Sequence, residues 1–299
     1  MIYRTLFLAL SCLFCIGLPL NAQQIGDFKL HAHRGGSAHY PENSIEAMLY
    51  SASIGIPVLE LDVHMTGDNK VVVSHDPFLN PKKVVLNNGE QLIGGSQLRY
   101  IIYHMAYGNI LKYDIGSLPV KEFPNRINLP ASMPLLSQLI DEVEQFTQIN
   151  GLPPVTYNIE IKSHRLKDNR MSPPYETYTN QVMKVISSKH IDNRIIIQSF
   201  DPRTLNYLNR AYPNIKLSYL LSSSKYPLKT LYKKLDFTPA YFSPSYKLVT
   251  PGLINDCHKA GMKIVPWTVN HREDIQYLYR IGVDGIITDY PKLAQEWLK

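Results

Sequence analysis

Strand-like and helix-like runs alternate along nearly the whole chain, and no other feature of the sequence restricts the possible folds as strongly. The strand-like runs cover residues 28–33, 57–64, 70–74, 155–161, 194–199, 216–221, 240–245, 263–269 and 285–288. The helix-like runs cover residues 44–54, 135–148, 177–188, 202–211, 228–235, 251–260, 272–281 and 291–298. Because strands that alternate with helices form parallel sheets with helical crossovers, this order predicts an α/β fold.

The short segment between His64 and Lys70 determines how many of these strands are parallel. Only the residues MTGDN join the second strand-like run to the third, whereas a parallel crossover needs about a dozen residues or more. We therefore expect 57–64 and 70–74 to form an antiparallel hairpin with a turn around Gly67. Eight parallel strands remain, so the sequence predicts one (β/α)8 TIM-type barrel with a β-hairpin after strand 2.

Residues 1–22 have the pattern of a secretory signal peptide. Arg4 gives a short positive start, an apolar stretch follows, and Asn21 and Ala22 offer a small-residue cleavage point. We expect cleavage near Ala22 and a secreted or periplasmic protein. An uncleaved N-terminal anchor and lipidation at Cys12 are the alternatives.

The remaining residues, 23–299, have a normal length for one α/β barrel, so we expect a single domain. Within it, residues 77–134 carry turn signals but no strand–helix unit. Long excursions of this kind are often functional, and we expect a small insertion over the active face. Cys257 is the one cysteine that follows the predicted cleavage point, so no internal disulfide is expected.

The chain has a formal net charge of +6 and a pI near 9.0, which favours anionic partners. Its Lys and Arg residues are spread thinly, so no nucleic-acid partner is expected. No segment after residue 22 approaches the length of a membrane-spanning helix, so no stable membrane insertion is expected. The oligomeric state stays open.

Charged and polar residues gather at the predicted strand ends, which form the active face of a TIM barrel. They are His33 and Arg34 after the first run, Glu60, Asp62 and His64 on one face of the second, His75 after the third, and Asn158, Glu160 and Lys162 on one face of the fourth. Each alone would more often be structural, but their coincidence on one face favours a site. Buried carboxylates repel one another unless a cation joins them, and oxygen ligands suit Mg²⁺ or Ca²⁺.

The hairpin argument also predicts which residues face each other. A turn centred near residues 67 and 68 implies that the numbers of opposed residues add up to about 135. Glu60 would then lie opposite His75, and Asp62 opposite Val73, within a residue or so. Opposed side chains are close neighbours, so the hairpin would bring a carboxylate and a histidine into one site.

Five sequence blocks resemble the glycerophosphodiester phosphodiesterase family. In order, from residue 31 to residue 291, they are HAHRGGSAHYPENSIEA, ELDVHMTGDNKVVVSHDP, NIEIKS, WTVN and DGIITDYP. The resemblance implies a barrel with one divalent cation, Mg²⁺ or Ca²⁺, held by Glu60, Asp62 and Glu160. It further implies hydrolysis of a small-molecule phosphodiester to glycerol 3-phosphate and an alcohol.

The resemblance also implies roles for four further residues. His33 and His75 would be the acid–base pair, Arg34 and Lys162 would hold the phosphate, and the nucleophile would be the substrate's own neighbouring hydroxyl. The residue types suit these roles, because two histidines can divide proton transfer and an arginine fork fits phosphate oxygens. Trp267 would contact the glycerol or the alcohol, or else act as a core aromatic.

Three further residues within these motifs can be interpreted from their immediate sequence neighbours. We expect Asn43 to cap the helix that begins near Ser44, and Glu42 to reach the site. Asp289, in the TDYP motif, is interpreted as structural. One departure from the family concerns the segment that follows His75-Asp76. The family commonly has Leu-x-Arg-Thr there, whereas this chain has PFLN at residues 77–80. The family's contacts with the alcohol therefore do not carry over.

Other functions are compatible with parts of the sequence. A related barrel phospholipase of the C or D type would act on lipid head groups, and it would favour an apolar rim or a membrane-binding stretch, neither of which stands out here. A catalytically silent binding protein would be expected to have lost a ligand or a histidine, yet all five are present. A nucleic-acid phosphodiesterase would need a basic aromatic groove, which the sequence does not show.

Overall fold

The computed structural model describes residues 28–92 and 97–299. The predicted signal peptide and its cleavage point lie outside the described residues. Of the helices in these two ranges, none combines the length and the apolar character that crossing a bilayer would require.

The barrel strands are parallel, and among the described residues they follow the order β10-β9-β8-β7-β6-β2-β1-β11. Their bounds are β1 Lys29–Ala32, β2 Val58–Met65, β6 Thr156–Ile161, β7 Ile195–Ser199, β8 Lys216–Leu221, β9 Tyr241–Pro244, β10 Lys263–Ile264 and β11 Gly285–Thr288. Three backbone hydrogen bonds join the ends of this row, from Asp284 N to Ile264 O (3.0 Å), from Ile287 N to Pro266 O (2.9 Å) and from Val269 N to Ile287 O (2.9 Å). The sheet therefore returns on itself as a barrel.

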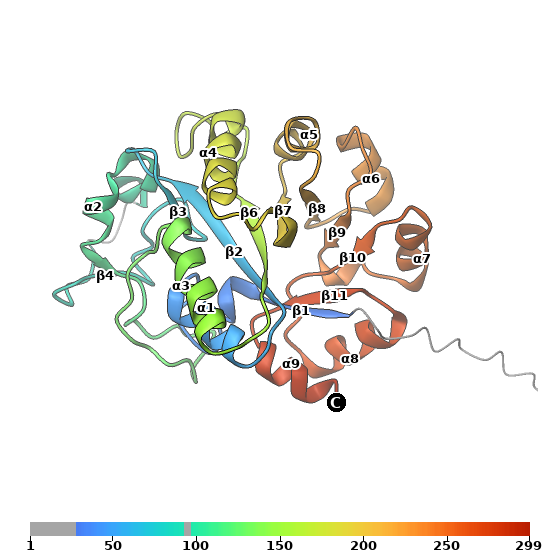
Figure 1. Ribbon diagram of the computed structural model, residues 1–299, viewed down its shortest axis with the longest axis horizontal. Helices are drawn as coiled ribbons and strands as arrows, with labels where there is room; N and C mark the ends of the chain where they lie inside the picture. The colour runs from blue at the N-terminus through green and yellow to red at the C-terminus, as the bar shows by residue number, and fades with distance from the viewer. Residues whose placement is uncertain (1–27, 93–96) are drawn as a thin grey trace, which may run out of the picture.

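Helices surround the strands as a ring (Figure 1). Their bounds are α1 Ile45–Ser53, α3 Leu136–Ile149, α4 Tyr175–Ser187, α5 Pro202–Ala211, α6 Pro227–Lys234, α7 Pro251–Lys259, α8 Arg272–Ile281 and α9 Pro291–Trp297. The local sequence starts several of them, because Pro291 and three other prolines occupy first-turn positions that need no amide proton. The predicted (β/α)8 barrel is confirmed.

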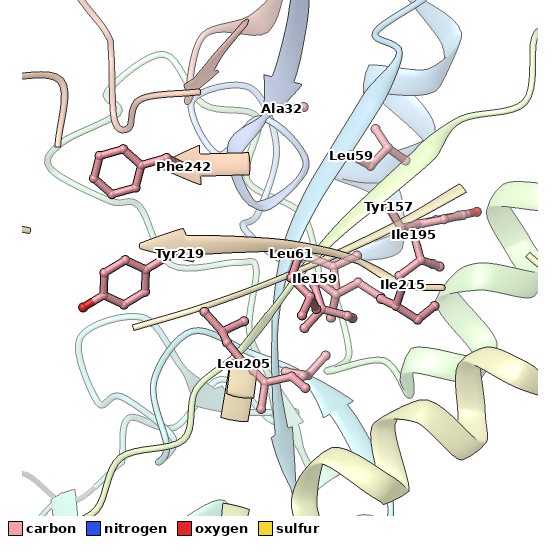
Figure 2. Close-up of a cluster of buried hydrophobic side chains, with 14 of the residues drawn as sticks. Ala32, Leu59, Leu61, Tyr157, Ile159, Ile195, Leu205, Ile215, Tyr219 and Phe242 are labelled. Carbon is pink, nitrogen blue, oxygen red and sulfur yellow. The ribbon is translucent and has the colours of Figure 1, made fainter. Parts of the chain in front are cut away.

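Residue alternation along the strands separates the packing core from the barrel interior. Leu59 and Leu61 on β2, with Tyr157 and Ile159 on β6, are fully buried in the main apolar cluster. Figure 2 shows these four side chains within a cluster of buried hydrophobic residues. Burial of each aliphatic side chain of this size contributes roughly 1.5–3 kcal/mol. The residues between them point the other way, since successive side chains of a strand alternate, and on β2 and β6 these are mainly polar.

The hairpin after strand 2 is confirmed, although its register differs slightly from the predicted one. Strand β3 (Val71–Val73) pairs antiparallel with β2, and Val63 lies opposite Val73, so opposed residue numbers add up to 136. The ladder ends at Val73, with one more hydrogen bond from Ser74 N to Asp62 O (2.9 Å), and the prediction that Glu60 lies opposite His75 is wrong. The reason is that the His75 carbonyl accepts a hydrogen bond from the His64 side chain, which leaves it outside the ladder.

One strand prediction was too long. Residues 263–269 were expected to be a strand, but β10 ends at Ile264. Pro266 has no amide proton and interrupts the ladder. Beyond it the chain has an isolated bridge from Trp267 to Ser245 and a hydrogen bond from Val269 N to Ile287 O (2.9 Å), but no further residues of β10.

Residues 77–134 form a small substructure beside β3 (Figure 1). It contains η2 Gln97–Tyr100, η3 Ile102–His104, α2 Tyr107–Ile110 and an antiparallel pair of short strands, β4 Val85–Leu86 and β5 Tyr113–Asp114. A second apolar cluster fills it, and Val72 of β3 belongs to that cluster. The insertion is therefore attached to the barrel through the hairpin strand.

Candidate active site

Three buried carboxylates meet inside the barrel mouth. Glu60 and Asp62 lie on β2, Glu160 lies on β6, and the parallel register places Asp62 directly beside Glu160. One oxygen of each carboxylate lies within 4.8 Å of the others. A cluster of oxygen ligands at this spacing fits a hard divalent cation such as Mg²⁺ or Ca²⁺.

The charges around the cluster show why it needs cations. Burial, together with the negative charge of Asp62, raises the pKa of Glu60 to about 8. Burial also raises the pKa of Glu160. Although burial alone would raise the pKa of Asp62 as well, Lys162 and Arg34 hold it well below its usual value. Three carboxylates this close are all ionised only when enough positive charge lies beside them.

Two cationic side chains lie against the carboxylates. The Lys162 Nζ atom is 3.2 Å from Asp62 Oδ1 and 3.1 Å from Glu160 Oε1. Arg34 Nε is 3.4 Å from Asp62 Oδ2 and has no hydrogen-bond partner although it is buried. A buried donor that lacks a partner at the mouth of the cluster is available to an anionic ligand.

The backbone at Arg34 is bent so that it also contacts the cluster. Its φ is +51°, in the left-handed region, and its N–H donates to Glu60 Oε2 at 2.8 Å. Gly35 follows with a φ of +82°, and a Cβ there would lie only 2.8 Å from Cβ of Ala47 on α1. Close packing on α1 thus accounts for this glycine and holds the strained turn in place.

His33 is held by a carboxylate from the opposite end of the chain. Its Nδ1 lies 2.6 Å from Asp289 Oδ1. Asp289 also accepts hydrogen bonds from the Ser37 hydroxyl and from Asn270 Nδ2. Burial opposes protonation, but the Asp289 carboxylate raises the pKa of His33 above its ordinary value. With Nδ1–H donated to Asp289, Nε2 is the ring nitrogen left for chemistry.

His75 has a more open environment. Its Nδ1 lies 3.0 Å from Asp76 Oδ1, and its side chain is 32% exposed. Asp76 also accepts from Asn80 Nδ2 at 2.9 Å. The His64 ring fixes the backbone here, because its Nε2 lies 3.1 Å from the His75 carbonyl oxygen. Burial lowers the pKa of His64 to about 3, so it donates this bond as a neutral ring.

The sequence profile of the glycerophosphoryl diester phosphodiesterase family matches residues 33–293 of this chain. The chain belongs to this family of phosphoric diester hydrolases. A glycerophosphodiester phosphodiesterase from Caldanaerobacter subterraneus subsp. tengcongensis is 29% identical over 261 residues, which are 87% of this chain and 93% of that protein. A human lysophospholipase D is 25% identical over 281 residues, 89% of this chain and 85% of the relative.

Solved structures show the same fold. A protein from Silicibacter pomeroyi DSS-3, described as a candidate glycerophosphoryl diester phosphodiesterase, superposes with a TM-score of 0.81 and 26% identity, covering 91% of this chain and 92% of that one. A phosphodiesterase from Oleispira antarctica, in complex with the product sn-glycerol-3-phosphate, has a TM-score of 0.71 at 22% identity and covers 90% and 96% of the two chains.

The structure brings together most of the residues that the motifs of this family singled out. The three carboxylates, Arg34 and Lys162 are in contact. Both histidines also interact electrostatically with the cluster. A positive charge on His33 favours the ionised form of Glu60, and a positive charge on His75 favours the ionised forms of Asp62 and Glu160. Trp267 is different. Its indole N–H donates to the Ser243 carbonyl at 2.8 Å, and its ring meets Phe200 edge to face at the rim.

Two residues near the cluster have roles that the sequence interpretation missed or misplaced. Asn43 does not cap α1, because Ser44 does so by accepting from Ala47 N at 3.1 Å. Asn43 instead has a φ of +59° and donates from Nδ2 to Asp62 Oδ2 at 3.0 Å. Gln198, on the inward face of β7, donates from Nε2 to Glu60 Oε1 at 2.8 Å. Only the inward position of Gln198 on a barrel strand signalled it.

Two further contacts complete the site. Asp289 was interpreted as structural, and the structure shows that the side chain it orients is His33. Glu42 reaches the site as expected, where it accepts from Arg34 at 2.9 Å and from Lys83 of the insertion at 2.8 Å. These two cations lower the pKa of Glu42 although its burial opposes this.

Proposed function

We propose that this chain hydrolyses glycerophosphodiesters to glycerol 3-phosphate and an alcohol, with one divalent cation, Mg²⁺ or Ca²⁺. The observation that carries the proposal is the arrangement of two carboxylate-paired histidines beside a buried carboxylate cluster that also touches an arginine and a lysine. His33 follows β1 and His75 follows β3, and both of these strands pair with β2. The relatives named for this activity support the same substrate class.

The carboxylates Glu60, Asp62 and Glu160 would hold the cation. Their geometry fits, since all three are buried and offer oxygens within 4.8 Å of one another. Burial, and then the negative charge of Asp62, raises the pKa values of Glu60 and Glu160, and a cation would offset both effects. A divalent ion in this place supplies positive charge to the phosphate oxygens of the substrate.

Arg34 and Lys162 would bind the phosphodiester. Both lie at the mouth of the cluster, with side chains that are 16% and 15% exposed. Arg34 Nε makes an ion pair with Asp62 at 3.4 Å but no hydrogen bond. Fixed donors of this kind stabilise the charge that develops on a phosphoryl group in the transition state. Trp267, at the rim, would contact the glycerol or the alcohol.

The two histidines would divide the proton transfers. Asp289 keeps His33 protonated to higher pH, which suits the general acid, so His75 takes the part of the general base. His75 would accept the proton of the glycerol hydroxyl whose oxygen attacks phosphorus, and His33 would give a proton to the departing alcohol oxygen. The attack would form a cyclic phosphate and release the alcohol. Water would then open the cyclic phosphate with the roles of the two histidines reversed, which returns each ring to its starting protonation state and yields glycerol 3-phosphate.

A substrate panel tests the proposal. Purified protein would be incubated with glycerophosphocholine, glycerophosphoethanolamine, glycerophosphoinositol, a lysophospholipid and a nitrophenyl phosphodiester, each with Mg²⁺, Ca²⁺ or a chelator. We expect release of glycerol 3-phosphate from the three glycerophosphodiesters, and of acylglycerol 3-phosphate from the lysophospholipid, that chelation abolishes and added cation restores. Turnover that continues unchanged in chelator would contradict the role of the cation. If no diester were turned over, the proposed function would be wrong.

The ligand set is tested separately by cation binding. We expect Glu60→Gln, Asp62→Asn and Glu160→Gln each to weaken Mg²⁺ or Ca²⁺ binding in calorimetry by at least tenfold. Glu144→Gln is a matched control, because Glu144 is partly buried and bonded to Arg194 but lies outside the cluster. If the control weakened cation binding as much as the three variants, the assignment of ligands would be wrong.

We also propose that the protein is secreted or periplasmic after cleavage near Ala22, from the pattern of residues 1–22. Fractionation of cells that express the full chain, with N-terminal sequencing of the product, tests this. A product that begins at Met1 in the cytoplasmic fraction would contradict it.

A further inference from the structure

The loops that follow β6 to β10 form one side of the barrel mouth and carry a distinctive set of side chains. We define this barrel rim as residues 164–168, 200–203, 222–229, 245–248 and 267. Each of these segments comes directly after the carboxyl end of a barrel strand, so all of them belong to the active face. The helices α6 and α7 on this side stand across the ring from the insertion (Figure 1).

An ion pair, a ring contact and backbone hydrogen bonds connect neighbouring rim segments into one surface. Arg203 Nη1 lies 2.7 Å from Asp168 Oδ2, which connects the loop after β6 to the start of α5. Phe200 and Trp267 stand edge to face with ring centroids 5.4 Å apart. Tyr246 N donates to Trp267 O at 2.9 Å, and Ser245 N donates to Leu221 O at 2.7 Å, just before the loop that carries Tyr226.

Large apolar side chains project from this surface. Leu166 is 75% exposed, Tyr226 is 58% exposed and Phe200 is 39% exposed. Each comes from a different loop, so none could form an apolar run in the sequence. Side chains of this size that converge on one face mark an interaction surface more often than isolated ones do.

The same surface is basic. Lys225 and Lys229 lie 5.5 and 6.0 Å from the centre of the Tyr226 ring, and Lys247 lies 6.0 Å from that of Tyr246. Arg165 stands beside Leu166. The two carboxylates of the rim, Asp168 and Asp201, both bind Arg203, so they are not free to cancel the lysines. The barrel rim thus combines shallow apolar tips with uncompensated positive charge.

We propose that the barrel rim docks reversibly on a bilayer surface that contains anionic lipid. Lysines attract anionic head groups over about a Debye length, while tyrosine and other amphipathic rings settle at the head-group level. The apolar tips are few and come from loops, so the attachment is shallow and needs both contributions. Docking would turn the mouth of the site toward the lipid.

This has a consequence for the substrate, and that consequence rests on the proposed function. A glycerophosphodiester embedded in the membrane by its acyl chain, such as a lysophospholipid, would reach the carboxylate cluster without leaving the surface. A water-soluble diester would gain nothing from docking. The rim therefore predicts a preference for membrane-borne diesters over soluble ones when anionic lipid is present.

Vesicle sedimentation tests the docking. The purified protein that begins after Ala22, without the apolar N-terminal segment, would be mixed with phosphatidylglycerol vesicles, or with phosphatidylcholine vesicles, at low and high salt. We expect it to pellet with phosphatidylglycerol at low salt, at least tenfold less at about 0.5 M salt, and not with phosphatidylcholine. Equal pelleting with both lipids, or none with either, would overturn the proposal.

Matched variants locate the contact. We expect Leu166→Ala with Tyr226→Ala, and Lys225→Gln with Lys229→Gln, each to reduce binding to phosphatidylglycerol at least tenfold. Ile149→Ala with Tyr277→Ala removes side chains of comparable exposure elsewhere, 73% and 46%. Lys233→Gln with Lys234→Gln removes charge at the far end of the same helix, α6. If these controls lost as much binding as the rim variants, the rim would not be the docking surface.

The activity of the same variants keeps the two proposals separate. On soluble glycerophosphocholine, we expect the rim variants to retain the wild-type rate, whereas on lysophospholipid in phosphatidylglycerol vesicles they should lose at least tenfold. If the protein pelleted with vesicles but cleaved no diester, the proposed function would fail and the docking would stand. If it cleaved diesters but pelleted with neither vesicle, the docking would fail alone.

Discussion

The two histidines of the site have different surroundings, although each has a carboxylate at its Nδ1. His33 is 16% exposed and lies 2.6 Å from Asp289, a residue 256 positions away. His75 is 32% exposed and lies 3.0 Å from its immediate neighbour, Asp76. The first pair forms where β1 meets β11, and the second forms where the hairpin strand leads into the insertion.

This difference supports the division of roles proposed above for the two rings. The His33 half is part of the barrel itself, because Asp289 is fixed by Ser37 and Asn270 as well as by the histidine. The His75 half is a loop that one buried ring, His64, holds by its backbone. Rigid placement and a raised pKa suit a group that must stay protonated, whereas a more open ring suits a group that meets an incoming hydroxyl.

The largest effect should come from removal of either ring. We expect His33→Ala and His75→Ala each to lower kcat by roughly 10²–10⁴, the usual contribution of a general acid or base. The fold should survive, since both rings sit at the loop-rich face, and circular dichroism would check this. Activity within a few-fold of wild type in either folded variant would show that this histidine is not part of the mechanism. The proposed division of roles between the two histidines would then be wrong.

A smaller effect is expected from Asp289→Asn, by about 10²-fold in kcat, because the amide no longer favours the Nδ1–H tautomer or the protonated ring. The pKa of His33 is raised in the folded protein, so protonated His33 persists to higher pH and its contribution is lost as the pH rises through that value. Loss of the carboxylate lowers the pKa, and the alkaline limb of the kcat profile should move to lower pH.

A second histidine–carboxylate pair provides the control for this experiment. Asp284 Oδ2 lies 2.8 Å from His258 Nε2, and both residues lie outside the site. We expect Asp284→Asn to leave the shape of the pH profile unchanged even if stability falls. A profile that moved equally in both variants, or in neither, would show that Asp289 does not set the protonation of His33.

The smallest effect should come from His64→Ala, which removes the hydrogen bond to the His75 carbonyl. We expect kcat to fall about tenfold with KM nearly unchanged, because the loop loses a fixed position while the phosphate contacts remain. A buried acceptor left without its donor costs about 1–3 kcal/mol of stability. His64→Gln, which keeps a donor, should recover most of kcat. Equal losses in the two variants would mean that His64 only fills space.

Much of this protein could be predicted from local pattern. The strands and helices follow the alternation of the chain closely, with α5 and α8 at the predicted bounds. The hairpin was predicted because MTGDN is too short for a parallel crossover, and the pair His75–Asp76 is adjacent in the sequence. These features depend on residues near one another along the chain, which is why periodicity and loop length revealed them.

Other features depend on packing between distant segments. Asn43 looked like a helix cap because it precedes Ser44, yet its positive φ turns its amide to Asp62. The ladder of β2 and β3 stops before His75 because His64 takes the carbonyl. The apolar rim was not visible in the sequence, since Leu166, Phe200 and Tyr226 come one from each loop.

The sequence by itself determined the barrel and the residue types of the site, because strand periodicity fixes which side chains point inward and five motifs carry the family resemblance. The tertiary structure alone decided the partners. Closure of β11 against β1 brings Asp289 to His33, and the register of β2 with β6 sets Asp62 beside Glu160. No local rule encodes these meetings, since the two members of each pair are far apart in the chain and are joined only when the barrel closes.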